Sequence, residues 1–187
     1  MPGAFVLGRR ALTVAQSAMG DGDLVAEQDR ATRYPGLAAA TMGGDIPGSS
    51  AAGEQPKFTT RVRRADGRTD SVIVKFSGAA GRPEDERWRD LLIAENLANS
   101  VLTEAGVPCA ATEVFQAGGR CFLESSRFDR MGEDGRRGFV SLEAFDSAFF
   151  GQLNRSWDEA SEGYARAGWL SREDADRLSL LWWFGTL

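Results

Sequence analysis

The sequence contains no histidine, and this absence excludes several kinds of catalytic site at once. Hydrolases of the Ser-His-Asp and Cys-His types need a histidine as the general base, and the HExxH zinc site needs two histidine ligands. The chemistry that remains is that of Asp, Glu, Lys and Ser side chains, together with any metal ion that they bind.

Cysteines and long apolar runs are also scarce. The two cysteines, Cys109 and Cys121, have a spacing that fits neither a zinc framework nor a disulfide-rich secreted module. No run of about 18 apolar residues occurs, and the apolar stretch near the N-terminus is too short for a signal peptide. We therefore expect a protein of the reducing cytoplasm, with no membrane anchor.

An excess of basic charge is absent as well. The chain has 22 Lys and Arg residues against 27 Asp and Glu residues, a formal net charge of -5. A surface that binds nucleic acid phosphates normally carries clustered Lys and Arg, so we expect no direct nucleic acid binding. Hydrophobic residues make up 42% of the chain and charged residues 26%, which is typical of a globular protein with a buried core.

The first 53 residues are rich in Gly, Ala and Ser, and their glycines interrupt every long periodic run. Short helices are plausible only around residues 11–19 and 35–42. We expect this region to be loosely packed.

Two hairpins are predicted downstream. Residues 59–65 and 69–76 are rich in β-formers and flank an Asp-Gly pair, which supplies the positive φ of a tight turn. Residues 112–117 and 120–125 flank a Gly-Gly pair in the same way. After these strands the chain becomes helical, with N-cap signatures at Ser141, Ser156 and Ser171. The order predicts an α+β fold.

A long helix is expected between the hairpins. It begins at Pro83, which is followed by three acids, and ends before Gly106. Three- and four-residue spacing predicts that one face carries Trp88, Leu91, Leu92, Glu95, Ala98, Leu102 and Ala105.

Lys75 and Glu95 are the candidate functional pair. Strand alternation directs Lys75 away from the face that carries Val72, Val74 and Phe76. A carboxylate on an apolar helix face needs a cationic partner, and Lys75 is the nearest candidate in the expected order. The alternative is that Lys75 reaches into water and Glu95 lies at the edge of its stripe.

Residues 45–58 precede the first hairpin and are rich in small side chains. Such residues let backbone N–H groups approach an anion closely, as in a phosphate-covering loop. The segment contains neither GxGxxG nor a P-loop. Without further information, a flexible linker is the favoured interpretation.

Together these residues resemble a known family, the HipA-like serine/threonine kinases of bacterial toxin-antitoxin systems, in their YjjJ-type branch. The resemblance covers roughly residues 35–187 and is carried by five stretches in order: GSSAAGEQPKF (48–58), VIVKF (72–76), RWRDLLIAE (87–95), RFDR (127–130) and SLEAFD (141–146).

The resemblance implies a kinase-like fold in three parts. Residues 1–34 form a poorly defined N-terminal segment, and residues 35–130 form the β-rich, ATP-binding N-lobe with its hinge. Residues 131–187 begin the helical C-lobe, which is incomplete in this chain.

The resemblance also implies an ATP site. Its residues are Ala52, Gly53, Glu54, Gln55, Pro56, Lys57, Lys75, Glu95, Ser126, Arg127 and Phe128. The loop of residues 52–57 covers the phosphates, Lys75 contacts them and is oriented by Glu95, and residues 126–128 are the hinge that meets adenine. Ser50 matches the autophosphorylated serine, whose modification removes the loop from the site.

Two departures from the family pattern affect these expectations. Ser126 stands where the family commonly has Glu, which weakens the contacts on the adenine side. Residues 180–187 match the helix that precedes the Asn-Thr-Asp catalytic loop, and nothing follows Leu187. ATP and Mg²⁺ are the cofactors implied, but no catalytic base or metal ligand is assigned to any residue here, so we expect the isolated chain not to transfer phosphate.

Two other interpretations of the chain remain open. The chain could be a non-catalytic pseudokinase fragment that regulates a partner, either an antitoxin or a complementary kinase chain. An unrelated α+β domain would require five ordered matches to arise by accident.

Overall fold

The computed structural model describes residues 24–43, 55–79, 81–132, 135–151 and 155–186. The chain divides into two compact units, residues 1–138 and residues 139–187, which we call the sheet unit and the helical unit. The mixed α and β content agrees with the expected fold class.

The described part of the sheet unit contains a five-stranded sheet with strand order β1-β2-β3-β5-β4. Its strands are β1 (Leu24–Ala26), β2 (Lys57–Arg63), β3 (Thr69–Phe76), β4 (Thr112–Ala117) and β5 (Arg120–Ser126). Strand β1 runs parallel to β2, and the other neighbours are antiparallel. Both predicted hairpins are confirmed, and Gly67, Gly118 and Gly119 supply the positive φ of their turns.

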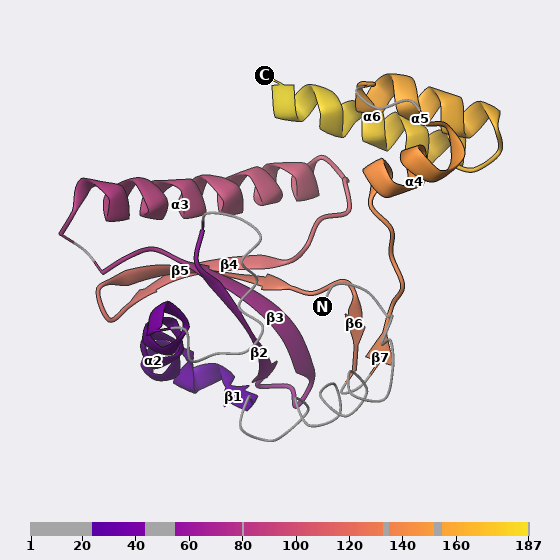
Figure 1. The fold of residues 1–187 in the computed structure, drawn as a ribbon. Coiled ribbons are helices and arrows are strands. Elements are labelled where there is room, and N and C mark those ends of the chain that lie inside the picture. The colour runs from indigo at the N-terminus through magenta and orange to yellow at the C-terminus, as the bar shows by residue number, and fades with distance from the viewer. Residues whose placement is uncertain (1–23, 44–54, 80, 133–134, 152–154, 187) are drawn as a thin grey trace. The chain divides into compact units, whose positions relative to one another are not determined.

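Two helices cover opposite faces of this sheet (Figure 1). Helix α2 (Arg30–Gly43) packs on the face that carries Val74 and Phe76, and helix α3 (Pro83–Glu104) packs on the face that carries Leu123. A one-turn 3-10 helix, η2 (Glu27–Asp29), joins β1 to α2. Because strand side chains alternate, each strand contributes to both layers.

The core on the α2 side is aromatic. The ring of Tyr34 lies 5.3 Å from that of Phe58, 5.6 Å from that of Phe115 and 5.7 Å from that of Phe122. Such edge and tilted contacts add to the hydrophobic stabilisation of burial. The expectation of loose packing is therefore wrong for Leu24–Gly43, and α2 begins five residues before the predicted start. The helix expected around residues 11–19 lies outside the described residues.

The helix predicted between the hairpins is confirmed as α3, but its inward face is narrower than expected. Leu92 and Leu102 are buried, whereas Leu91 and Ala105 are exposed. Leu91 is one residue from Leu92 and so lies about 100° away around the helix, beyond the part that the sheet covers. The C-cap residue Ala105 lies past the last turn.

After β5 the chain forms a small two-stranded sheet, β6 (Arg130–Met131) with β7 (Gly135–Arg136). The helical unit contains α4 (Leu142–Phe149), α5 (Trp157–Arg166) and α6 (Arg172–Thr186). The three predicted N-caps are confirmed, since the hydroxyls of Ser141, Ser156 and Ser171 each accept a backbone N–H bond three residues on. Among the helices described, none has the length and apolarity needed to cross a membrane.

Candidate functional site

The structure brings Lys75 and Glu95 together. Lys75 Nζ donates to Glu95 Oε1 at 2.7 Å and to Oε2 at 2.8 Å. Lys75 lies next to the end of β3 on the α3 side of the sheet, and Glu95 lies one turn after the buried Leu92 of α3. The side chains remain 29% and 38% exposed, so the pair is held in place but accessible to a solute.

The face that carries Lys75 is rich in cations. Lys57 of β2 pairs directly with Lys75, and Arg61 and Arg63 follow on the same face of β2. Like charges directly opposite each other repel. Lys57 is the cation nearest to Lys75 in the sheet register, while Arg61 and Arg63 lie farther along β2.

The predicted hinge is tied to both neighbours of β5. The backbone N–H of Ser126 donates to Ala111 O, and that of Arg127 donates to Ser71 O, both at 2.9 Å. Both N–H groups are thus used inside the sheet unit. Phe128, in contrast, exposes 61% of its surface.

Asp129 holds the turn that follows the hinge. Its buried carboxylate accepts from Arg127 Nε at 2.8 Å and Nη2 at 2.6 Å, and from Arg130 Nη1. Bidentate pairs of this kind combine charge with fixed geometry. The RFDR motif therefore has a structural role in shaping the chain after Ser126.

The predicted phosphate loop is described only in its last part. Ser50, Ala52, Gly53 and Glu54 lie outside the described residues. Gln55, Pro56 and Lys57 are described and lead into β2, where Pro56 O accepts from Phe76 N at 3.2 Å. Among the described residues of the predicted loop, Lys57 is the one that pairs with Lys75 across β2 and β3.

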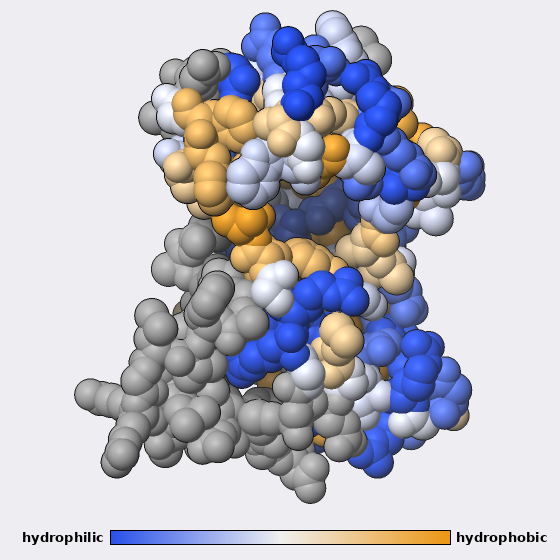
Figure 2. Space-filling model, turned by 90° about the vertical axis from the view of Figure 1, so that its right-hand side faces the viewer, coloured by the Kyte–Doolittle hydropathy of each residue, from blue (hydrophilic) through white to orange (hydrophobic). Residues whose placement is uncertain are grey.

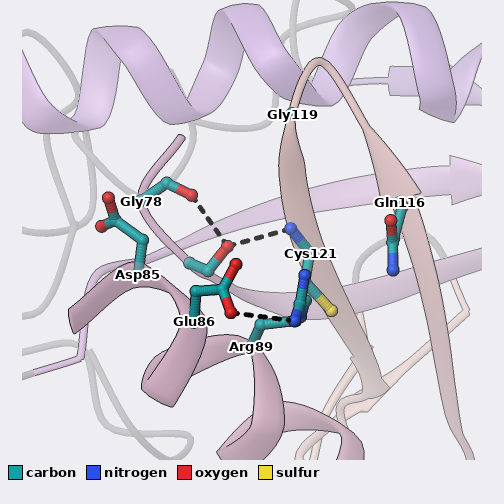
Figure 3. Close-up of a pocket in the computed structure, with 8 residues that line it drawn as sticks. Gly78, Asp85, Glu86, Arg89, Gln116, Gly119 and Cys121 are labelled. Atoms are coloured by element: carbon teal, nitrogen blue, oxygen red, sulfur yellow. Dashed lines mark hydrogen bonds and ion pairs between the residues drawn. The ribbon is translucent and has the colours of Figure 1, made fainter. Parts of the chain in front are cut away.

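A small cavity of about 80 Å³ lies beside the first turns of α3, and Ser77, two residues after Lys75, is part of its lining (Figure 3). It is lined by Ser77, Gly78, Asp85, Glu86, Arg89, Gln116, Gly119 and Cys121, none of which was a predicted site residue. Burial raises the pKa of the Cys121 thiol, which makes it a poor nucleophile. The volume suits a few water molecules and is too small for a nucleotide.

Sequence reasoning missed a buried ionic cluster on the α2 side. Glu124 is 2% exposed and lies among two arginines and Tyr34. Burial, together with the hydrogen bond to Glu124, raises the pKa of Tyr34. One signal existed in the sequence: Glu124 shares a strand face with Phe122, which is an unusual place for a carboxylate unless it is paired.

A second missed group lies in the helical unit. Asp146 Oδ1 accepts from Tyr164 Oη at 2.7 Å and from Arg155 Nη2 at 2.6 Å. Burial and the bond to Asp146 raise the pKa of Tyr164 to about 12. Because the SLEAFD stretch contains Asp146, part of that motif has a structural role within this unit.

Comparison with known proteins adds independent information. A family model described as the HipA-like C-terminal domain matches residues 49–167. The chain is also 38% identical over 157 residues to a protein of Escherichia coli (strain K12) named Toxin YjjJ, in a match that covers 83% of this chain and 35% of that protein. This chain therefore spans about a third of the length of that relative. No solved structure matches the chain significantly.

Proposed function

The chain belongs to the HipA-like family, and on that premise we propose that its sheet unit binds ATP for the transfer of the γ-phosphate to a protein serine. The observation that carries the proposal is the ion pair between Lys75 and Glu95, at 2.7 and 2.8 Å. Kinases use such a pair between a strand lysine and a helix glutamate to hold the phosphates of ATP.

The geometry of Lys75 supports a phosphate contact. An ammonium group has three N–H donors, and Glu95 accepts at most two of them. The remaining N–H is available to a phosphate oxygen, while the bonds to Glu95 hold the ammonium in one position. Lys57, opposite Lys75, adds a second positive charge for the same polyphosphate.

The hinge supplies the adenine side of the proposed site. Because the N–H groups of Ser126 and Arg127 already donate within the sheet unit, other backbone groups of residues 126–128 would hold the base. The Ser126 hydroxyl replaces the family's carboxylate and can donate as well as accept.

Phosphoryl transfer consists mainly of positioning and charge neutralisation. Lys75 would neutralise developing charge on the phosphate oxygens, and Glu95 would fix its position. ATP supplies the phosphoryl group and brings Mg²⁺ with it. The described residues contain no group of three or more His, Cys, Asp or Glu side chains placed to hold a metal ion.

Ser50 is the proposed autophosphorylation site, on the basis of the family resemblance. A phosphate adds nearly two negative charges. Placed beside a bound polyphosphate, it would repel the nucleotide and drive the loop out of the site.

The test is nucleotide binding by the 187-residue chain, measured by calorimetry or by displacement of a fluorescent ATP analogue in the presence of Mg²⁺. We expect Lys75→Ala to lower ATP affinity about tenfold or more, the loss of one charge-assisted hydrogen bond. The matched control is Arg68→Ala, because Arg68 is an exposed cation paired with Asp66 in the β2–β3 turn. Equal ATP affinity in wild type and Lys75→Ala would refute the proposal.

A second candidate function is partner binding by the helical unit, for which the relative's name, Toxin YjjJ, suggests an antitoxin; a complementary kinase chain is the other possible partner. Figure 2 shows hydrophobic residues on the surface of this unit, in the upper part of the view. The exposed residues include Phe149, Trp157, Trp169, Leu180 and Trp183. Large exposed apolar side chains of this kind mark interaction surfaces. Concentration-dependent self-association or a stable complex, combined with no ATP binding, would favour this reading.

A further inference from the structure

The buried carboxylate of Glu124 is the centre of an ionic cluster that joins five elements of the sheet unit and the corner after β2. We call it the Glu124 cluster, and it consists of Glu27, Arg30, Tyr34, Arg64, Asp70, Glu113 and Glu124. Its members come from η2, α2, β3, β4, β5 and the corner after β2.

Both oxygens of Glu124 have partners. Oε1 accepts from Arg64 Nη2 at 2.8 Å and lies 3.2 Å from Arg30 Nη1. Oε2 accepts from Tyr34 Oη at 2.5 Å. A buried carboxylate with this set of partners has one preferred position, because any shift lengthens several charge-assisted bonds at once.

The two arginines connect this carboxylate to the rest of the sheet unit. Arg64 Nε donates to Asp70 Oδ2 at 2.8 Å, and its Nη1 donates to Glu27 Oε1 at 3.3 Å. Arg30 Nη1 donates to Glu113 Oε2 at 2.6 Å. The cluster therefore fixes β5 with respect to β3, β4 and α2 through side chains, in addition to the backbone ladder.

The position of Glu124 in the sheet links this cluster to the proposed ATP site. Glu124 pairs with Val74, the residue before Lys75, and Ser126 pairs with Val72. Glu124 thus lies two residues before the hinge and one strand away from the phosphate-binding lysine. Its side chain is on the opposite face from Lys75, so it cannot contact the nucleotide itself.

We propose that Glu124 is a positioning residue that sets the hinge, residues 126–128, at the correct distance from Lys75 for an adenine nucleotide. This inference rests on the proposed function of ATP binding. Buried ionic groups are often no more stabilising than apolar residues of the same shape, so stability alone does not account for the cluster. Its specific contribution is a fixed register and orientation of β5.

The test uses Glu124→Gln, which keeps the size of the side chain and removes its charge. Two probes are compared in the presence of Mg²⁺: ATP, which needs both the hinge and Lys75, and inorganic triphosphate, which needs only the phosphate end. We expect ATP affinity to fall about tenfold, the equivalent of one misplaced hydrogen bond, while triphosphate affinity changes less than about twofold.

Two further variants are measured with the same two probes, one as a control and one as a milder perturbation of Glu124. Glu104→Gln is the matched control, because it makes the same substitution on an exposed carboxylate in the last turn of α3, outside the Glu124 cluster, and it should leave both affinities unchanged. Tyr34→Phe removes one hydrogen bond to Glu124 without a change of charge, and it should lower ATP affinity about threefold without affecting triphosphate. This milder variant also serves if Glu124→Gln does not fold.

The outcomes separate the two proposals. If the substitutions at Glu124 and Tyr34 lower the affinity for ATP and triphosphate equally, or change neither, the positioning role is wrong while the ATP site stands. If the wild-type chain binds ATP no better than Lys75→Ala does, the proposed function fails and the positioning role fails with it.

Discussion

The two faces of one sheet carry two ion pairs with opposite properties. On the α2 side, Glu124 is buried, and its two oxygens share three partners, Tyr34, Arg30 and Arg64. On the α3 side, Lys75 and Glu95 bond to each other and remain partly exposed, and no other described residue bonds to either side chain. Residues in neighbouring sheet positions thus differ in what they can do: a saturated buried pair can only fix structure, whereas an accessible pair with an unused N–H can bind a ligand.

The largest expected effect tests this comparison by removing one carboxylate from each face. Glu124→Ala leaves Arg30 and Arg64 partly uncompensated in a buried site, which should lower the free energy of unfolding by about 3–5 kcal/mol. Glu95→Ala removes a partly exposed pair and should cost about 1 kcal/mol or less. Urea denaturation followed by circular dichroism measures both. Equal losses would mean that the two pairs do not differ in the way the geometry indicates.

A smaller effect concerns the ionisation of tyrosine side chains, including that of Tyr34 on the α2 side. The chain has two tyrosines, and burial and an acceptor carboxylate raise the pKa of both, that of Tyr164 to about 12. A raised pKa in the folded state means that the folded chain holds its phenol protons more tightly than the unfolded chain. The stabilisation is therefore fully present below pH 10, near the unfolded pKa, and is lost as the pH rises through the folded pKa.

Alkaline titration monitored by tyrosinate absorbance provides the measurement. In the native chain we expect no tyrosine to ionise with a midpoint near pH 10, whereas in denaturant both should. Above pH 10 the free energy of unfolding should fall by up to about 1.4 kcal/mol per pH unit for each tyrosine. In Tyr34→Phe the remaining transition belongs to Tyr164 in the helical unit. A native transition at pH 10 that disappears in this variant would show that the Glu124 cluster is open to solvent.

Sequence patterns were sufficient to pair Lys75 with Glu95 on the α3 side and insufficient for the ionic cluster on the α2 side, for a physical reason. The pairing of Lys75 with Glu95 follows from strand alternation, helix periodicity and the order of the elements, all of which are local rules. Their roles toward ATP stay a prediction. The Glu124 cluster joins residues up to 90 positions apart, as in the bond from Tyr34 to Glu124, and no local rule selects those partners.

The packing of residues 24–43 was missed for a related reason. Their Gly and Ala content indicated loose structure, because small residues give a weak periodic signal. The anchor is one aromatic side chain, Tyr34, whose ring contacts three phenylalanines from β2, β4 and β5. A single buried residue of this kind can place a whole helix, and its effect becomes visible only when the strands that it contacts are known.

The smallest expected effect is the change in stability on shortening an exposed leucine of α3, compared with a buried leucine of the same helix. Leu92 is 0% exposed against the sheet, and Leu97, five residues later, is 63% exposed. Five residues correspond to about 500° of rotation, or 140° beyond one turn, which carries Leu97 to the outer side of the helix. Leu97→Ala removes little buried surface and should change the free energy of unfolding by no more than about 0.5 kcal/mol. Leu92→Ala, its matched control, should cost about 2–5 kcal/mol. If Leu97→Ala instead costs as much as Leu92→Ala under the same denaturation conditions, the outer side of α3 is covered in solution and the difference between the two sides of the helix is wrong.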